Sequence, residues 1–167
     1  MVTENLKKVE KKIESACTRA GRDRNDVTLI AVSKTKPVEM MREAMQCGIV
    51  TFGENKVQEM VEKQTELTEP LDWHMIGHLQ RNKVKQVVGR VKRIHSVDSI
   101  RLAKQIQLES EKRNITSDIL IEVNMAKEES KYGFMPEEVE EAIREISTYP
   151  NVKIHGLMTI APNVSNP

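Results

Sequence analysis

The chain has 167 residues, of which 38% are hydrophobic and 31% are charged. This length suits one domain, and 26 Lys and Arg against 25 Asp and Glu exclude a strong overall basic field for nucleic acid. No apolar stretch approaches the ~20 residues of a membrane span, and the N-terminus has no signal-peptide core. The isolated Cys17 and Cys47 argue against a disulfide scaffold. We expect a cytoplasmic, metal-independent protein that binds neither nucleic acid nor a membrane.

The first third of the chain alternates between helix and strand signals. Apolar residues at spacings of three and four predict a helix over 3–20, with Gly21 as its stop. The nearly continuous apolar run over 27–33 is typical of a strand that is buried on both faces of a parallel sheet. Pro37 suits the first residue of the next helix, which we expect to end at Gly48.

The same cycle of strand, turn and helix recurs along the rest of the chain. Further strands are predicted over 49–52, 72–76, 93–97, 118–124 and 152–160, and helices over 55–67, 82–91, 99–113 and from Pro136 onward. Strands that alternate with helices at this spacing indicate βαβ units and a parallel sheet. This α/β pattern fits either a doubly wound sheet or a TIM barrel, and a complete barrel typically needs ~250 residues.

Both architectures place functional groups at the carboxyl ends of the strands. The residues expected there are Ser33, Lys34, Gly53, Glu54, Asn55, His74, Gly77, His78, Asp98, Asn124, Met158 and Thr159. No HExxH, GxGxxG or GxxxxGK[ST] stretch is present. These absences argue against a zinc enzyme and against a glycine-rich phosphate-binding loop.

Lys34 is the most unusual of these residues because it closes an apolar strand. By strand alternation it points the same way as Ile30 and Val32. If that face lies inside a barrel, burial disfavours the charged amine and makes it a competent nucleophile toward an aldehyde. The alternative is a strand-end lysine that reaches into water. Similarly, His74 could be a hydrogen-bonded core residue, and Asn55 could be a turn or helix-cap residue.

An ordered set of short motifs covers nearly the whole chain. The motifs are LIAVSKTKP over 29–37, FGEN over 52–55, WHMIGHLQRNK over 73–83, IHSVD over 94–98, IEVN over 121–124, SK over 130–131 with Gly133, and GLMTI over 156–160. In this order they resemble the YggS/PROSC family of pyridoxal 5′-phosphate (PLP) homeostasis proteins. Members of that family resemble the N-terminal barrel of alanine racemase.

The resemblance implies a fold, a cofactor and a site. The fold is an α/β TIM (β/α)8-type barrel, here incomplete with about six of the eight strands and with an extra N-terminal helix. The cofactor is PLP, held as a Schiff base on the lysine of the AVSK strand, which is Lys34 here. The other residues implied to line the cofactor pocket are Asn55, His74, Ser96 and Met158.

The family is regarded as a PLP carrier or buffer in vitamin B6 homeostasis, without robust turnover. We therefore expect a non-catalytic PLP-binding regulator, with PLP-dependent apoenzymes as recipients and a monomeric state for the complete family member. A racemase needs two acid/base groups on opposite faces of its bound substrate, and the only tyrosines are Tyr132 and Tyr149. The alternatives are a PLP-dependent racemase-like enzyme and a truncated fragment that no longer retains the cofactor.

The family pattern continues beyond the GLMTIAP-like segment, whereas this sequence ends at Pro167. We therefore expect residues 1–167 to form a single PLP-binding, alanine racemase-like barrel domain that lacks C-terminal strands seven and eight. The resemblance implies that those strands carry the serine and the backbone amides that bind the phosphate. An arc without them leaves two open edges, so we expect weaker PLP retention and lower stability than in a complete member.

Overall fold

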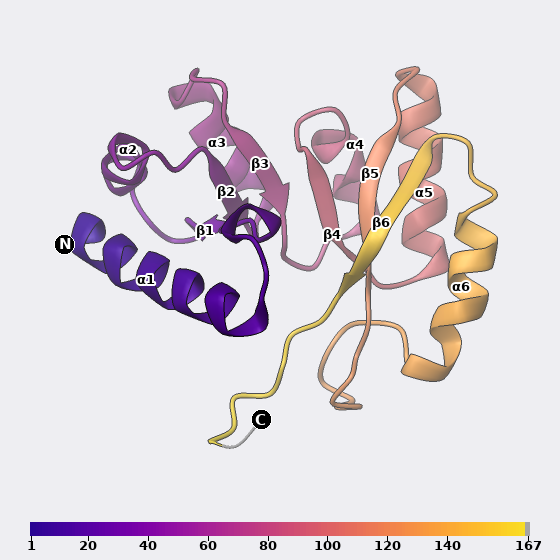
Figure 1. Ribbon diagram of the computed structural model, residues 1–167. Helices are drawn as coiled ribbons and strands as arrows, with labels where there is room; N and C mark the ends of the chain where they lie inside the picture. Colours follow the sequence, from indigo (N-terminus) through magenta and orange to yellow (C-terminus); the bar gives the residue numbers. More distant parts are fainter. Residues whose placement is uncertain (166–167) are drawn as a thin grey trace.

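Six parallel strands form one sheet in the order β1-β2-β3-β4-β5-β6 (Figure 1). The computed structural model describes residues 1–165, so residues 166–167 of the predicted domain 1–167 lie outside the described part. The strands are β1 (Ala31–Val32), β2 (Thr51–Glu54), β3 (Asp72–Met75), β4 (Arg93–Val97), β5 (Ser117–Glu122) and β6 (Val152–Met158). A sequential order without reversal excludes the doubly wound alternative and fits the arc of a barrel.

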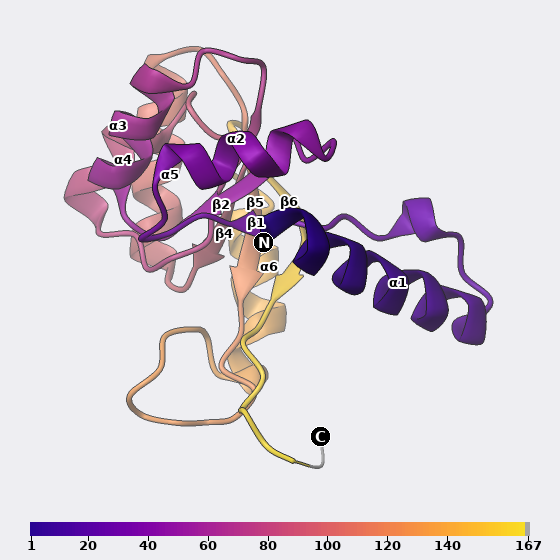
Figure 2. The same ribbon diagram turned by 90° about the vertical axis from the view of Figure 1, so that its left-hand side faces the viewer.

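Helices connect the strands on one face of the sheet, because right-handed crossovers in sequential order return on the same side. The helices are α1 (Val2–Ala20), α2 (Val38–Gln46), α3 (Val57–Glu66), α4 (Val84–Val87), α5 (Ile100–Lys112) and α6 (Val139–Ile146), with short 3-10 helices at Arg24–Asp26, Arg81–Lys83 and Pro136–Glu138. The extra helix α1 precedes the first strand and extends away from the sheet (Figure 2). Within residues 1–165, no helix is both long and apolar enough to cross a membrane.

Local sequence explains where several helices begin and end. Gly21 ends α1 with a φ of 64°, as predicted. Ser99 caps α5, because its Oγ accepts a hydrogen bond from the Leu102 amide at 3.2 Å. The predicted helix over 82–91 is too long, since α4 ends at Val87 and the chain turns at Gly89 with a φ of 82°.

The first strand is shorter than the predicted 27–33. Its ladder pairs Ala31 with Phe52 and Val32 with Gly53 of β2. In this register, Leu29 and the residues before it would have to pair with residues before Thr51, where β2 has not yet begun. Because β1 and β6 form the two edges of the described sheet, β1 has no second neighbour that could extend its pairing.

The hydrophobic core fills the space between the sheet and its helices. It combines nearly inaccessible strand residues with nearly inaccessible helix residues, among them Phe52, Met75, Ile94, Ile119, Met60, Leu102, Ile106 and Ile146. Burial of each such side chain stabilises the fold by roughly 1.5–3 kcal/mol. Strand alternation turns the neighbouring residues Gly53, His74 and His95 toward the opposite, inner face of the sheet. These three residues therefore lie on the side of the sheet away from the helices.

Candidate functional site

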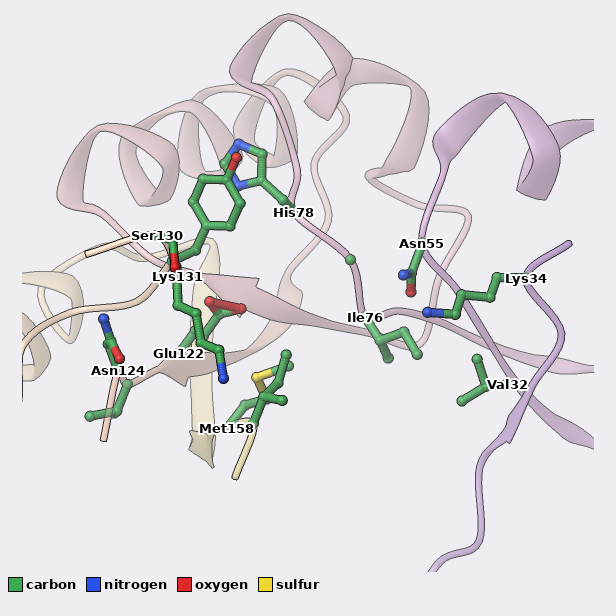
Figure 3. Close-up of a pocket in the computed structure, with 14 residues that line it drawn as sticks. Val32, Lys34, Asn55, Ile76, His78, Glu122, Asn124, Ser130, Lys131 and Met158 are labelled. Carbon is green, nitrogen blue, oxygen red and sulfur yellow. The ribbon is translucent and has the colours of Figure 1, made fainter. Parts of the chain in front are cut away.

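A cavity of about 440 Å³ lies at the carboxyl ends of the strands (Figure 3). Figure 3 shows Lys34 and Asn55 on one side of the cavity and Glu122, Asn124 and Lys131 on the other. The rest of the wall includes Val32, Ile76, His78, Ser130, Tyr132, Met158 and Ile160. Two amines, a carboxyl group and two amides thus face one space between otherwise apolar surfaces.

Lys34 lies in the turn that follows β1, and its side chain is exposed. It lines the cavity together with Val32, as strand alternation predicts. The expectation of a buried, low-dielectric amine is wrong, because β1 ends at Val32 and the turn carries Lys34 to the rim. The alternative of a strand-end lysine that reaches into water describes its burial better. A ligand in the cavity can therefore reach this amine directly.

A close backbone contact fixes the Asn55 side of the cavity. A Cβ atom on Gly77 would lie 2.6 Å from both the Cα and the carbonyl oxygen of Asn55, nearer than real Cβ atoms approach. The absence of a side chain at residue 77 lets the chain that leaves β3 touch the chain that leaves β2. This contact keeps the Asn55 amide on the wall.

A loop that is held by its own hydrogen bonds forms the opposite side of the cavity. The Asn124 amide donates to the carbonyl of Phe134 at 2.8 Å, and the Asn124 side chain donates to the carbonyl of Glu128 at 2.7 Å. Gly133 has a φ of 121°, and a Cβ there would lie 2.6 Å from the Asn124 nitrogen. These contacts close the loop on itself and place Lys131 on the cavity wall.

Two rings from different segments stack beside the cavity. The Tyr132 and His78 rings have centroids 3.7 Å apart and planes 8° from parallel. His78 Nδ1 lies 3.1 Å from Asp98 Oδ2, at the end of β4. This carboxylate favours the proton on Nδ1 and orients the imidazole ring. The pair forms a flat aromatic surface at the cavity wall.

Glu122 is the last residue of β5 and is only 7% exposed. Burial, assisted by the negative charge of Asp98, raises the pKa of its carboxyl group to about 7. Near neutral pH this group is present in both protonation states. It can therefore accept or donate a proton inside the cavity.

The cavity wall contains three of the five residues that the family resemblance implied: Lys34, Asn55 and Met158. His74 lies outside it, with Nδ1 2.8 Å from His95 Nε2. Burial is the main cause that lowers the pKa of both rings, to about 4 for His95, so both are neutral at pH 7. Ser96 is buried, and within residues 1–165 its hydroxyl has no hydrogen-bond partner. Cofactor binding by these residues stays a prediction.

Four polar cavity residues were not among the predicted site residues: Glu122, Ser130, Lys131 and Tyr132. Strand alternation could have indicated Glu122, because it precedes Asn124 by two positions and shares its face. Lys131 and Tyr132 come from a loop whose path no periodicity predicts. Within the described part of the chain, no group of three or more His, Cys, Asp and Glu side chains could hold a metal ion.

Comparison with known proteins defines the class of fold. Residues 5–167 match the family model of the alanine racemase N-terminal domain. An alanine racemase from Clostridium difficile is 16% identical, with a TM-score of 0.70 over 82% of this chain and 37% of that one. The α/β barrel arc is thus that of the alanine racemase N-terminal domain, as the sequence predicted.

Relatives with higher sequence identity define the family within this class. The pyridoxal phosphate homeostasis protein of Aquifex aeolicus is 47% identical over 165 residues, which cover 98% of this chain and 72% of that protein. The structure of PipY from Synechococcus elongatus with PLP bound is 34% identical, with a TM-score of 0.82 over 99% of this chain and 73% of that one. The chain belongs to the family of pyridoxal phosphate homeostasis proteins.

Proposed function

We propose that this chain binds PLP in the cavity at the strand ends and acts in PLP (vitamin B6) homeostasis. The observation that carries the proposal is the accessible primary amine of Lys34 on the cavity wall. When bound, PLP supplies an aldehyde and an electron-withdrawing ring. The amine of Lys34 condenses with that aldehyde to a Schiff base, and water leaves. Similarity to PipY with PLP bound supports this ligand.

The side chains of the cavity fit PLP in their chemistry. Asn55 offers an amide and Lys131 an ammonium group to a polar, anionic ligand, while Met158 contributes apolar surface. The stacked Tyr132 adds a flat aromatic face. We assign Lys34, Asn55 and Met158 to the ligand. His74 and Ser96 are absent from this wall, and contact of either residue with the ligand stays a prediction.

The proposed role is that of a carrier or regulator rather than a catalyst. The amine of Lys34 lies in an exposed turn, and an open site suits delivery of a cofactor better than control of a reaction. In this proposal the recipients are PLP-dependent apoenzymes, the location is the cytoplasm and the complete protein is a monomer. Residues 1–167 act as one PLP-binding domain.

A racemase-like enzyme is the second candidate, and one observation favours it. Lys34 and Glu122 face the cavity from opposite sides (Figure 3), and the Glu122 pKa of about 7 suits proton transfer at neutral pH. Two such groups are what racemisation requires. Incubation with PLP and an amino acid in deuterium oxide separates the candidates, because an enzyme would exchange the substrate α-proton at a rate that Glu122→Gln abolishes.

The direct test is covalent trapping of the ligand. The chain is mixed with PLP, its visible spectrum is recorded before and after borohydride reduction, and the adduct is mapped by peptide mass. We expect one adduct at Lys34, which Lys34→Ala removes and Lys36→Ala in the same exposed turn retains. Adducts scattered over surface lysines would contradict the proposal. No adduct at all would favour a chain that does not retain the cofactor.

A further inference from the structure

A buried lysine lies beneath the turn that carries Lys34. Lys63 belongs to α3, which packs against β2 (Figure 1), and its side chain is only 8% exposed. Its Nζ donates to the carbonyl oxygen of Ser33 at 2.6 Å, to Glu54 Oε1 at 2.7 Å and to Glu59 Oε1 at 2.7 Å. All three protons of the ammonium group therefore have acceptors.

The two carboxylates extend this network to the backbone and side chain of the turn. Glu54 is fully buried, and its Oε1 also accepts a hydrogen bond from Ser33 Oγ at 2.6 Å. Glu59 Oε1 also accepts from the backbone amide of Thr35 at 2.6 Å. The network thus binds the residue before Lys34 and the residue after it, while Lys63 joins the two carboxylates.

The turn needs such support for two reasons. It lies beyond the last paired residue of an edge strand, so only the Ser33 amide, bonded to Gly53 O at 3.0 Å, continues the ladder. In addition, Thr35 has a φ of 60°, a left-handed conformation that a β-branched residue holds only when its surroundings fix it. Without the network, the turn would lose the contacts that set the direction of Lys34.

We propose that Lys63 is a positioning residue, which through Glu54 and Glu59 holds the 33–35 turn so that Lys34 faces the cavity. This inference rests on the proposed function, in which Lys34 is the covalent anchor for PLP. Lys63 itself is absent from the cavity wall as described and contacts the turn from the α3 side. It acts on the ligand only through the backbone and side chain of Ser33 and the Thr35 amide.

The test compares Lys63→Met with Lys56→Met, a control at the exposed N-terminal end of the same helix. The first readout is hydrogen exchange at the Thr35 amide without PLP. We expect at least about tenfold faster exchange in Lys63→Met, the change that loss of one hydrogen bond to a charged group produces. The second readout is the share of borohydride-fixed PLP on Lys34 against that on Lys131. That share should fall severalfold in Lys63→Met at equal folded fraction and stay unchanged in Lys56→Met.

A milder pair of variants covers the case in which Lys63→Met does not fold. Glu59 is more exposed, at 23%, and Glu59→Ala removes the acceptor for the Thr35 amide. Glu59→Gln keeps an oxygen at that position. We expect faster Thr35 exchange and less Lys34 adduct in Glu59→Ala, with Glu59→Gln close to the unchanged chain.

The outcomes separate this inference from the proposed function. If folded Lys63→Met or Glu59→Ala keeps both the Thr35 exchange rate and the Lys34 share of the adduct, the inference is overturned. If Thr35 exchange accelerates but the Lys34 share stays constant, Lys63 supports the fold only, and the positioning role is also overturned. Failure of the unchanged chain to form an adduct at Lys34 contradicts the proposed function first, and removes the positioning role with it.

Discussion

Two strands of this molecule end in a buried glutamate, and the two carboxyl groups behave differently. Glu54 ends β2 with 0% exposure, and Glu122 ends β5 with 7%. Glu54 accepts hydrogen bonds from Lys63 and Ser33. Glu122 faces the cavity (Figure 3), and within residues 1–165 its carboxyl group has no cationic partner in the structure.

The difference shows that position at a strand end does not determine the role of a residue. The face of the strand does. On the helix side, α3 supplies an ammonium group, so the Glu54 carboxylate joins a structural ion pair. On the inner side the same residue type meets desolvation and the charge of Asp98, so the Glu122 pKa rises to about 7. A group that keeps its proton near neutral pH is available for chemistry, whereas a paired carboxylate is not.

Removal of the cation should produce the largest effect. Lys63→Met leaves Glu54 as an uncompensated charge in a buried site, and we expect a loss of about 3–5 kcal/mol in the free energy of unfolding. Urea denaturation monitored by circular dichroism measures it. The exposed Lys56→Met should change stability little. A loss below about 1 kcal/mol, the value of a surface ion pair, would mean that another group compensates the charge of Glu54. The contrast between Glu54 and Glu122 would then not hold.

The second prediction concerns Glu122 and the direction of its pH dependence. Its folded pKa of about 7 lies above the ordinary 4.5, so the folded state binds the proton more tightly than the unfolded state. Glu122 therefore contributes about 3 kcal/mol to the free energy of unfolding below pH 4.5. This contribution is lost as the pH rises through 7. Glu122→Gln should remove this loss.

Urea unfolding at pH 5, 6, 7 and 8 measures the slope. Glu129→Gln is the control, since Glu129 is an exposed residue of the adjacent loop and should leave the slope unchanged. If the unchanged chain and Glu122→Gln lose stability in parallel between pH 5 and 7, the Glu122 carboxyl group has an ordinary environment. The contrast with Glu54 would then disappear.

The smallest expected effect concerns the hydrogen bond between Ser33 and Glu54. Ser33→Ala removes the hydroxyl that donates to Glu54 Oε1 at 2.6 Å. We expect a loss of about 1.5 kcal/mol, typical of a hydrogen bond to a charged group. Thermal unfolding gives the measurement, with the exposed Ser130→Ala as control. A destabilisation as large as that of Lys63→Met would show that the hydroxyl rather than the ammonium group sustains the buried carboxylate.

Periodicity predicted the fold better than the site. The strand over 93–97 agrees with β4, and the helix over 99–113 differs from α5 by one residue at each end. The strand β4 has a paired neighbour on both sides, and α5 carries an apolar repeat along 13 residues. The strand over 27–33 was too long because its extent depends on the partner strand β2, which its own sequence does not specify.

The site depended on tertiary contacts that sequence shows only weakly. Lys34 was identified from its place after an apolar run, but its exposure depends on where β1 stops pairing. Lys63 follows Glu59 by four positions and the buried Met60 by three, and this spacing places it between the polar and the buried face of α3. The same spacing is equally compatible with a surface lysine, so it does not predict that Lys63 is buried. Only the fold brings Ser33 and Glu54 within reach of its ammonium group.

The backbone contact at Gly77 has a consequence for which ligands the cavity can accommodate. Because the chains leaving β2 and β3 touch without an intervening side chain, changes of rotamer cannot widen or narrow that wall. The opposite wall presents long, rotatable side chains such as Lys131 on a loop. Divergence in ligand preference among homologous chains should therefore arise through substitutions on the loop side, while the spacing between Asn55 and residue 77 stays constant.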